Sequence, residues 1–306
     1  MLLIMPSAWC VTEKSIHIRD EMMMLLALQV VCLLAASSLA SAFQSHDAGG
    51  RWIPPSSGDD RGAVIFLHGM GDTANGWASL DHMLPSICPR LSTEKIEYMF
   101  PQAPVKAITL NGGELVPAWF DLFDWPIDST SRDDVIGQLN AVCMLEETVR
   151  KIEHERGIPA SRIVVGGFAQ GAAVAMLASY FRKERKLQPF AGCVCLSGWL
   201  PNSWNFPVNR YVAEMTPLLW AHGAFDGKVL YQQQALGVQR LMKEGVDVTK
   251  RTYPCAHESY NSQEIKDMAE FVDNVLFPKV PKQVATAEFV ASVKYLFEQN
   301  ADQYNP

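Results

Sequence analysis

The residues of this 306-residue chain whose pattern is most typical of catalysis surround a short glycine turn. Residues 162–173 read RIVVGGFAQGAA, in which a strand-like apolar run enters the turn GFAQG (167–171) and a helix-like run follows at once. A strand, a tight turn and a helix around G-x-X-x-G present a nucleophile at the edge of a sheet. The central residue of such a turn is normally serine, whereas this chain has Ala169, which has no oxygen to attack a carbonyl carbon. Taken alone, the pattern is more often an ordinary glycine turn.

Two polar residues follow predicted strands further along the chain. Asp226 follows an apolar run at 217–220, and His257 follows a β-prone run at 246–253. Taken alone, each residue has an ordinary interpretation, because a loop aspartate is usually a solvated turn residue and a histidine near a helix start often caps that helix.

Short apolar strands that alternate with helices are predicted to position these residues. Strands are predicted at 63–67, 163–165, 193–196, 217–220 and 246–253, and helices at 133–155, 170–181, 230–243 and 262–276. This alternation indicates βαβ units. We therefore expect an α/β fold with a mostly parallel central sheet that is flanked by helices on both faces.

Length and composition are typical of one globular domain. The chain is 48% hydrophobic and 19% charged, with a net charge of -7. We predict one α/β domain at 61–278, a polar leader rich in Gly, Ser and Pro at 43–60, and a C-terminal extension at 279–306 with a helix at 283–299. No basic run is present, so nucleic acid is not expected as a partner.

The first 42 residues are predicted to be a targeting segment. Residues 22–42 read MMMLLALQVVCLLAASSLASA, carry no charge and end in Ala-Ser-Ala. An apolar run followed by an A-x-A site is typical of a cleaved signal peptide and predicts a protein of the secretory pathway or the extracellular space. The alternative is a signal anchor, because these uncharged residues are long enough to span a bilayer.

The cysteines do not predict a disulfide framework or a metal site. Beyond residue 42 their number is odd, no C-x-x-C occurs, and two of them alternate along an apolar run. This pattern indicates core thiols with at most one or two bridges, and we expect neither a metal nor a cofactor. The cysteines concerned are Cys88, Cys143, Cys193, Cys195 and Cys255.

Six motifs, in the right order along the chain, resemble those of the acyl-protein thioesterase, lysophospholipase and carboxylesterase family. They are FLHGMGD (66–72, followed by Trp77), PQAPVKAITLNGGELVPAWFDL (101–122), GGFAQGA (166–172), LSGWLP (196–201), AHGAFDGKV (221–229) and AHESYNSQEIKDMAEFV (256–272). The resemblance covers about residues 60–278 and implies an α/β-hydrolase fold. It also implies hydrolysis of carboxylic esters or thioesters by a serine nucleophile.

The resemblance assigns roles to five residues. Ala169, Asp226 and His257 match the nucleophile, acid and histidine positions, in the chain order that α/β-hydrolases use. The backbone N–H groups of Met70 and Gln170 match the oxyanion hole, which stabilises developing negative charge. Because these donors are main-chain groups, we expect the hole to survive whatever stands at position 169.

Apolar residues near the second motif are candidates for binding an acyl chain. The candidates are Leu115, Trp119, Phe120 and Trp125, with Val116 beside them. Core packing is an equal alternative for this set. By contrast, His68, His222 and Ser197 stand at predicted strand ends, and we expect them to be structural.

The chain departs from the family pattern next to Asp226 as well. Ala224 replaces the first acidic residue of H-G-D-x-D, Leu230 replaces the proline that follows the motif's valine, and Lys228 stands close to Asp226. A single engineered Ser→Ala change would leave these surroundings intact. Natural loss of the nucleophile is therefore the favoured interpretation.

Three functional hypotheses follow. The first is a catalytically inactive protein that binds an acyl ester or thioester ligand, a lipid or an acylated protein, with a membrane surface left open as a partner. The second is an active lysophospholipid or palmitoyl-protein hydrolase in which Ala169 is an engineered or erroneous replacement of serine. The third is a hydrolase that uses water directly, with His257 as the general base.

Overall fold

The computed structural model describes residues 50–53, 62–180, 188–201, 208–257 and 262–278. The predicted targeting segment and the predicted C-terminal helix both lie outside these residues. The chain divides into two compact units, residues 1–276 and residues 277–306. The elements below all belong to the first unit.

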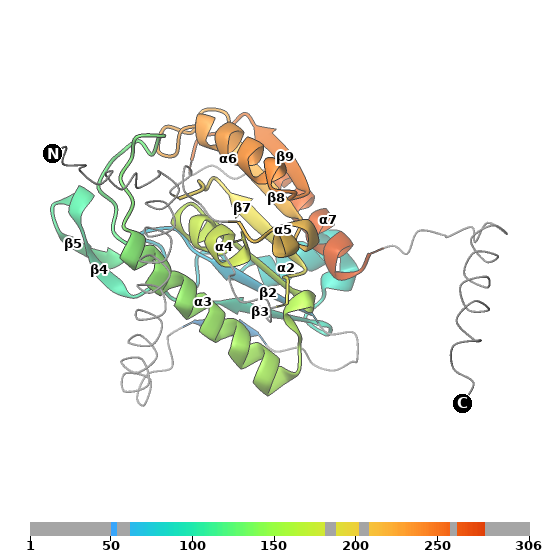
Figure 1. The fold of residues 1–306 in the computed structure, drawn as a ribbon. Coiled ribbons are helices and arrows are strands. Elements are labelled where there is room, and N and C mark those ends of the chain that lie inside the picture. Colours follow the sequence, from blue (N-terminus) through green and yellow to red (C-terminus); the bar gives the residue numbers. More distant parts are fainter. Residues whose placement is uncertain (1–49, 54–61, 181–187, 202–207, 258–261, 279–306) are drawn as a thin grey trace, which may run out of the picture. The chain divides into compact units, whose positions relative to one another are not determined.

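A seven-stranded sheet with the order β1-β3-β2-β6-β7-β8-β9 forms the centre of this unit (Figure 1). Its strands are β1 (Arg51–Ile53), β2 (Gly62–Leu67), β3 (Ile96–Phe100), β6 (Ile163–Phe168), β7 (Gly192–Leu196), β8 (Leu218–Gly223) and β9 (Val248–Tyr253). Strand β1 runs antiparallel to β3, and every other neighbouring pair is parallel. The predicted α/β fold with a mostly parallel sheet is confirmed.

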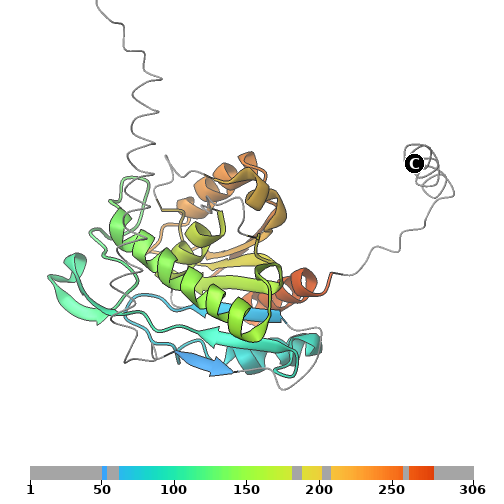
Figure 2. The ribbon, with the colours of Figure 1, turned by 60° about the horizontal axis from the view of Figure 1, so that its bottom comes forward.

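Helices cover both faces of this sheet. They are α2 (Leu80–Ile87), α3 (Val135–Arg156), α4 (Gln170–Tyr180), α5 (Arg210–Met215), α6 (Gln232–Lys243) and α7 (Ser262–Leu276), with short 3-10 helices at Pro89–Leu91, Thr109–Asn111 and Ala160–Arg162. Buried residues of α3, α4, α5 and α6 share one hydrophobic cluster with the sheet, whereas α2 packs against α7. Figure 2 shows α3 and α4 lying together along one side of the strands.

Strand β2 is apolar throughout because the side chains on both of its faces are buried. Ala63, Ile65 and Leu67 belong to the cluster of α3 to α6, while Val64 and Phe66 are buried outside it. Successive side chains of a strand point to opposite faces, and both faces here are covered by helices. A strand in this position has no place for a polar residue, which is why hydropathy alone predicted it.

Several elements were not predicted from the sequence. Strand β1 lies inside the stretch expected to be a polar leader, and it is only three residues long. Strand β3 carries a glutamate, α2 contains a proline, and α5 has only six residues. A separate two-stranded hairpin, β4 (Val105–Ile108) and β5 (Glu114–Pro117), stands within the second motif. Short or interrupted segments lack the periodicity that identifies an element.

The five cysteines of the described residues are free thiols. No disulfide joins Cys88, Cys143, Cys193, Cys195 or Cys255 in the described part of the chain. Burial in β7 raises the pKa of the Cys193 thiol to about 12 and also raises the pKa of Cys195. Both thiols therefore remain protonated and act as small apolar core groups.

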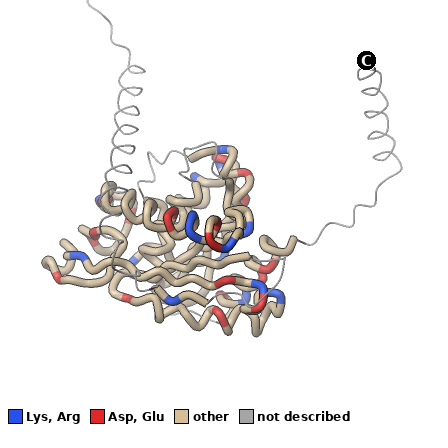
Figure 3. The backbone as a smooth tube through the Cα atoms, turned by 90° about the horizontal axis from the view of Figure 1, so that it is seen from below, with Lys and Arg blue, Asp and Glu red and all other residues tan. Residues whose placement is uncertain are grey.

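Charged residues are distributed over the described surface without segregation by sign. Figure 3 shows acidic and basic residues interspersed along the same elements. One ion pair, Arg240–Glu244 at 2.7 Å, joins the last turn of α6 to the residue that follows it. Among the described residues, no helix has the length and apolar character needed to cross a membrane.

Candidate active site

The predicted strand, turn and helix are present around Ala169. Strand β6 ends at Phe168, Ala169 adopts a left-handed backbone conformation with φ 49°, and α4 begins at Gln170. The Ala169 N–H donates to the carbonyl oxygen of Leu196 at 2.9 Å, which ties the turn to the end of β7. A left-handed non-glycine residue costs on the order of 1–3 kcal/mol and persists only where its surroundings enforce it.

Two glycines enforce this turn by allowing close backbone approach. A Cβ atom on Gly167 would lie 2.5 Å from the carbonyl carbon of Gly171, and a Cβ atom on Gly171 would lie 2.3 Å from the carbonyl oxygen of Leu67. Both neighbours are backbone atoms that cannot rotate away. The glycines of the GFAQG turn are therefore required by packing, whatever side chain occupies position 169.

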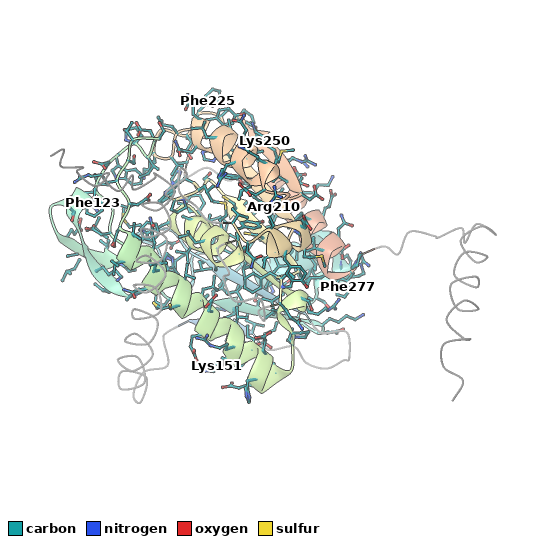
Figure 4. All side chains as sticks on the ribbon, in the orientation of Figure 1. Phe123, Lys151, Arg210, Phe225, Lys250 and Phe277 are labelled. Atoms are coloured by element: carbon teal, nitrogen blue, oxygen red, sulfur yellow. The ribbon has the colours of Figure 1, made fainter. Side chains whose placement is uncertain are left out.

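Asp226 and His257 form a buried hydrogen-bonded pair. His257 Nδ1 and Asp226 Oδ2 are 2.7 Å apart, and the two residues are 7% and 5% exposed. The other carboxylate oxygen, Oδ1, accepts the N–H groups of Lys228 and Val229, both at 2.9 Å. Neighbouring Phe225 points outward (Figure 4) and is 71% exposed. The loop after β8 thus turns the carboxylate inward and holds it by its own backbone.

His222 is a third member of this cluster, which the sequence analysis treated only as structural. Its Nε2 lies 3.2 Å from Asp226 Oδ2 and 2.9 Å from the carbonyl oxygen of Val229. The Nε2–H tautomer donates to both oxygens. Burial opposes ionisation of Asp226, but hydrogen bonds from His222 and His257 outweigh it and hold the pKa of Asp226 well below its usual range. The signal that could have identified His222 was its position four residues before the acid.

His68 braces the end of β2, as expected. Its Nδ1 donates to the carbonyl oxygen of Gly69 at 2.7 Å, and its Nε2 accepts the N–H of Ala103 at 3.0 Å. Burial lowers the pKa of His68, so the neutral ring matches these one-donor, one-acceptor contacts. Trp119 adds a hydrogen bond from its indole Nε1 to the carbonyl oxygen of His68 at 2.8 Å.

The expected oxyanion donors, Met70 and Gln170, line one cavity with Ala169 and His257. The Gln170 side chain is used elsewhere: its Oε1 accepts the N–H of Trp119 at 2.8 Å, and its Nε2 donates to the carbonyl oxygen of Phe120 at 2.7 Å. Gln170 therefore ties the 101–122 segment to the start of α4. Its backbone N–H belongs to the first turn of α4, where N–H groups have no acceptor within the helix.

This cavity has a volume of about 510 Å³. Of the four residues expected to bind an acyl chain, only Trp125 lines it. Leu115 is 69% exposed on the β4–β5 hairpin, whereas Trp119 and Phe120 are each 1% exposed within the core. The prediction for these three residues is corrected: the β4–β5 turn carries Leu115 away, and hydrogen bonds to Gln170 hold the other two in the core.

Apolar residues that the sequence analysis did not assign form most of the cavity wall. They come from the loop after β2, from α2, from the loop after β7 and from α7, and include Trp77, Leu80, Met83, Trp199 and Ile265. Trp77 follows the first motif, and it is the one residue of this set whose place at the cavity the sequence could have indicated. The others belong to elements whose approach to the cavity depends on the tertiary fold.

Three charged side chains also line the cavity: Asp72, Lys228 and Glu264. Lys228 Nζ lies 6.0 Å from the centre of the Trp125 ring. Burial, followed by the nearby charge of Asp267, raises the pKa of Glu264 to about 7. The described residues include no group of three or more His, Cys, Asp or Glu that could hold a metal ion.

Backbone strain in the described residues is concentrated at this cavity. The only non-glycine residues with positive φ there are Ala169, at 49°, and Ser197, at 48°. Ser197 follows β7 and lines the same cavity, but its backbone N–H is used by the carbonyl oxygen of Ala221 at 2.9 Å. A histidine paired with a carboxylate, two open backbone donors and an apolar wall can bind an acyl group. At position 169 the chain has only a methyl group, which cannot attack the carbonyl carbon of a bound acyl group.

Proteins with similar sequences include acyl-protein thioesterases. The chain is 35% identical over 214 residues to acyl-protein thioesterase 1 homolog 1 of Dictyostelium discoideum, covering 70% of this chain and 90% of that protein. It is 32% identical over 223 residues to acyl-protein thioesterase 1 of Saccharomyces cerevisiae, covering 71% of this chain and 93% of that protein.

These relatives correct the location predicted from residues 22–42. Acyl-protein thioesterases of this kind are generally intracellular enzymes, so the prediction of a secreted or membrane-anchored protein is wrong. The prediction rested on an apolar run ending in small residues. Composition of that kind does not show that a targeting receptor reads the segment.

Solved structures and a family model agree with the sequence relatives. The crystal structure of Zea mays acyl-protein thioesterase 2 matches with a TM-score of 0.62 and 26% identity, covering 74% of this chain and 99% of that one. A Bacillus cereus carboxylesterase, at 16% identity and a TM-score of 0.57, shares the fold. The family model described as phospholipase/carboxylesterase matches residues 50–276. The chain therefore belongs to the phospholipase/carboxylesterase family of α/β-hydrolases.

Proposed function

We propose that this protein binds acyl groups in the cavity at Ala169 and does not hydrolyse them through a serine nucleophile. The observation that carries the proposal is the identity of residue 169: an alanine with φ 49° between β6 and α4, in the cavity that His257 lines. A nucleophile in this position of a serine hydrolase forms the acyl-enzyme. A methyl group forms no such bond.

The expected loss of catalysis is large. Removing the nucleophile of a serine hydrolase costs on the order of a millionfold in kcat, and the residual rate over water comes from binding and the oxyanion hole. His257, Asp226 and the N–H groups of Met70 and Gln170 would fill their ordinary roles if a hydroxyl were present. Without a hydroxyl at position 169, these groups support binding of the acyl group only.

The relatives indicate the class of ligand. Their name, acyl-protein thioesterase, implies acylated or lipid substrates, which carry a long apolar chain next to a carbonyl group. The apolar wall of the cavity suits the chain, and its polar end suits the carbonyl group. An acylated protein, a lysophospholipid or a simple long-chain ester has the required chemistry.

Purified native protein and the Ala169→Ser variant test this proposal. We expect no labelling of the native protein by a fluorophosphonate probe and no turnover of p-nitrophenyl octanoate above background. The variant should gain labelling and a kcat/KM at least about a thousandfold above that of the native protein, because the remaining groups would serve a hydroxyl. Ala169→Ser combined with His257→Ala should lose this gain.

Labelling of the native protein at a rate like that of the variant would contradict the proposal. Two serine hydroxyls line the cavity, those of Ser79 and Ser197. Ser79→Ala and Ser197→Ala in the native background therefore identify the labelled residue in that case. Neither variant should change a native protein that is not labelled.

A second candidate is an active ester or thioester hydrolase whose natural residue at position 169 is serine. It is favoured by the 2.7 Å bond between His257 and Asp226, which an acyl-binding protein does not need for chemistry. Sequencing that codon from the source organism decides between the two. An alanine codon supports the binding function, and a serine codon supports the hydrolase.

A further inference from the structure

Two backbone donors in the cavity have no acceptor within the described part of the protein. The N–H group of Met70, after β2, and the N–H group of Gln170, at the start of α4, donate no hydrogen bond to any described backbone or side-chain oxygen. Gln170 is 1% exposed. Buried N–H groups are nearly always paired in native proteins, so the open Gln170 donor indicates a missing acceptor, and the half-buried Met70 donor can share it.

A third polar atom of the cavity is also open. His257 is 7% exposed, and its Nδ1 is used by Asp226 at 2.7 Å. Its Nε2 has no partner among the described residues. The ring packs against Phe168, with 4.9 Å between ring centres, which holds it next to the turn that carries Ala169. In a serine hydrolase this nitrogen bonds the nucleophilic hydroxyl, which is absent here.

We infer that the cavity binds a free long-chain carboxylate rather than an ester. One carboxylate oxygen accepts the N–H groups of Met70 and Gln170. The other occupies the space that a serine hydroxyl would fill at position 169, next to His257 Nε2. This inference rests on the acyl-binding function proposed above and adds the chemical form of the acyl group.

The backbone donors of the site and the helix N-terminus beside them favour a carboxylate over an ester carbonyl. Hydrogen bonds to an ionised oxygen are about twice as strong as those between neutral groups. The N-terminus of α4 adds the positive end of its helix dipole, which favours an anion beside Gln170. An ester fully matches an oxyanion hole only in the transition state, whereas a carboxylate carries its negative charge in the ground state.

The inferred complex takes up one proton. In the neutral imidazole, Nδ1 carries the hydrogen that Asp226 accepts, so Nε2 presents a lone pair that repels a carboxylate oxygen. One proton from solvent, shared between Nε2 and that oxygen, turns the repulsion into a charge-assisted hydrogen bond. No covalent bond forms or breaks. The imidazole contacts Asp226, which His222 also contacts, and the charged side chains that line the cavity with it are Asp72, Lys228 and Glu264.

The cavity accommodates the alkyl chain of such a ligand. Its volume of about 510 Å³ falls within the range of small-molecule sites. Trp77, Met83, Trp125 and Ile265 belong to its apolar wall. Burying the chain against these residues supplies affinity, while the polar end selects among head groups.

Isothermal titration of the native protein with dodecanoate and dodecanamide tests the inference. The two compounds have the same chain and nearly the same shape, but only one is ionised. We expect dodecanoate to bind at least about tenfold more tightly at pH 6.5. In Ala169→Ser the hydroxyl fills the second oxygen site and bonds Nε2, so the preference for dodecanoate should fall below that of the native protein, while the two N–H donors retain part of it.

Equal binding of the two compounds by the native protein would overturn the inference while leaving the acyl-binding function in place. Binding of neither would overturn both. Titration at pH 8 in two buffers of different ionisation enthalpy gives a second readout, with an expected uptake of about one proton for each dodecanoate bound. Glu264→Gln should keep this uptake; loss of the uptake in that variant would place the proton on Glu264 and refute the role of His257.

Discussion

Asp226 is held as an anion by more hydrogen bonds than the orientation of one histidine requires. Two backbone N–H groups, His257 and His222 all approach its carboxylate. Because these contacts fix both oxygens, the imidazole of His257 has one available orientation and one favoured tautomer. At the scale of a single residue, the site is preorganised for proton transfer although position 169 carries no acidic hydrogen.

The dependence on Asp226 can be measured once a hydroxyl is restored. In the Ala169→Ser background, Asp226→Asn should lower kcat by on the order of ten-thousandfold, because an amide permits the wrong tautomer of His257. Ester hydrolysis under saturating p-nitrophenyl octanoate provides the measurement. Lys228→Met in the same background is the matched control, because it keeps the backbone N–H that residue 228 donates to the carboxylate. A similar loss of kcat in both variants would refute the assigned role of Asp226.

At the scale of elements, the turn between β6 and α4 is held by backbone packing that does not involve the side chain at position 169. Gly171 brings the first turn of α4 against the carbonyl oxygens of Leu67 and His68 at the end of β2. The α4 helix that follows is buried at every position. An alanine at position 169 is therefore compatible with this turn and with the hydrolase architecture around it.

Gly171→Ala should destabilise the protein by about 1–3 kcal/mol or more, because its methyl group meets backbone oxygens at 2.3 and 2.6 Å. Gly227→Ala is the matched control, since an added Cβ there meets nothing within 4 Å. The control should change the free energy of unfolding by no more than about 0.5–1 kcal/mol. Urea denaturation followed by tryptophan fluorescence measures both, and equal stability of the two variants would contradict the packing argument.

For the whole molecule, stability is carried by burial on the two faces of the sheet rather than by its surface charges. Exposed pairs such as Arg150–Glu147, at 2.8 Å, contribute at most about 1 kcal/mol each. Glu264 differs, because it is 5% exposed and its pKa is raised to about 7 by burial. It connects the pH of the solution to the stability of the fold.

Glu264 should make the protein less stable as the pH rises. Its pKa is higher in the folded state than in the unfolded chain, so its contribution is fully present below about pH 4.5 and is lost as the pH rises to about 7. The loss amounts to roughly 3 kcal/mol. Glu264→Gln should remove this part of the pH dependence in urea titrations between pH 4.5 and 8, and the exposed Glu270→Gln on the same helix should retain it. Identical pH profiles for native protein and Glu264→Gln would show that burial does not perturb this carboxyl group.

The sequence by itself determined the fold class, the central strands and the turn at Ala169. Strands β2, β6, β7 and β8 are buried on both faces, so their residues must be apolar and their hydropathy identifies them. The glycines of the turn are visible for a similar local reason, because a side chain there would collide with neighbouring backbone. The order of Ala169, Asp226 and His257 along the chain can be read from the sequence alone.

Only the tertiary structure decided which side chains meet at the cavity. Met83 on α2 and Ile265 on α7 reach it because the two helices pack together, although they are far apart in sequence. The turn of the β4–β5 hairpin instead carries Leu115 into solvent, and His222 reaches Asp226 through the bend after β8. Hydropathy records whether a residue is buried, but contact between distant elements depends on how whole helices and strands pack, which no local pattern of residues encodes.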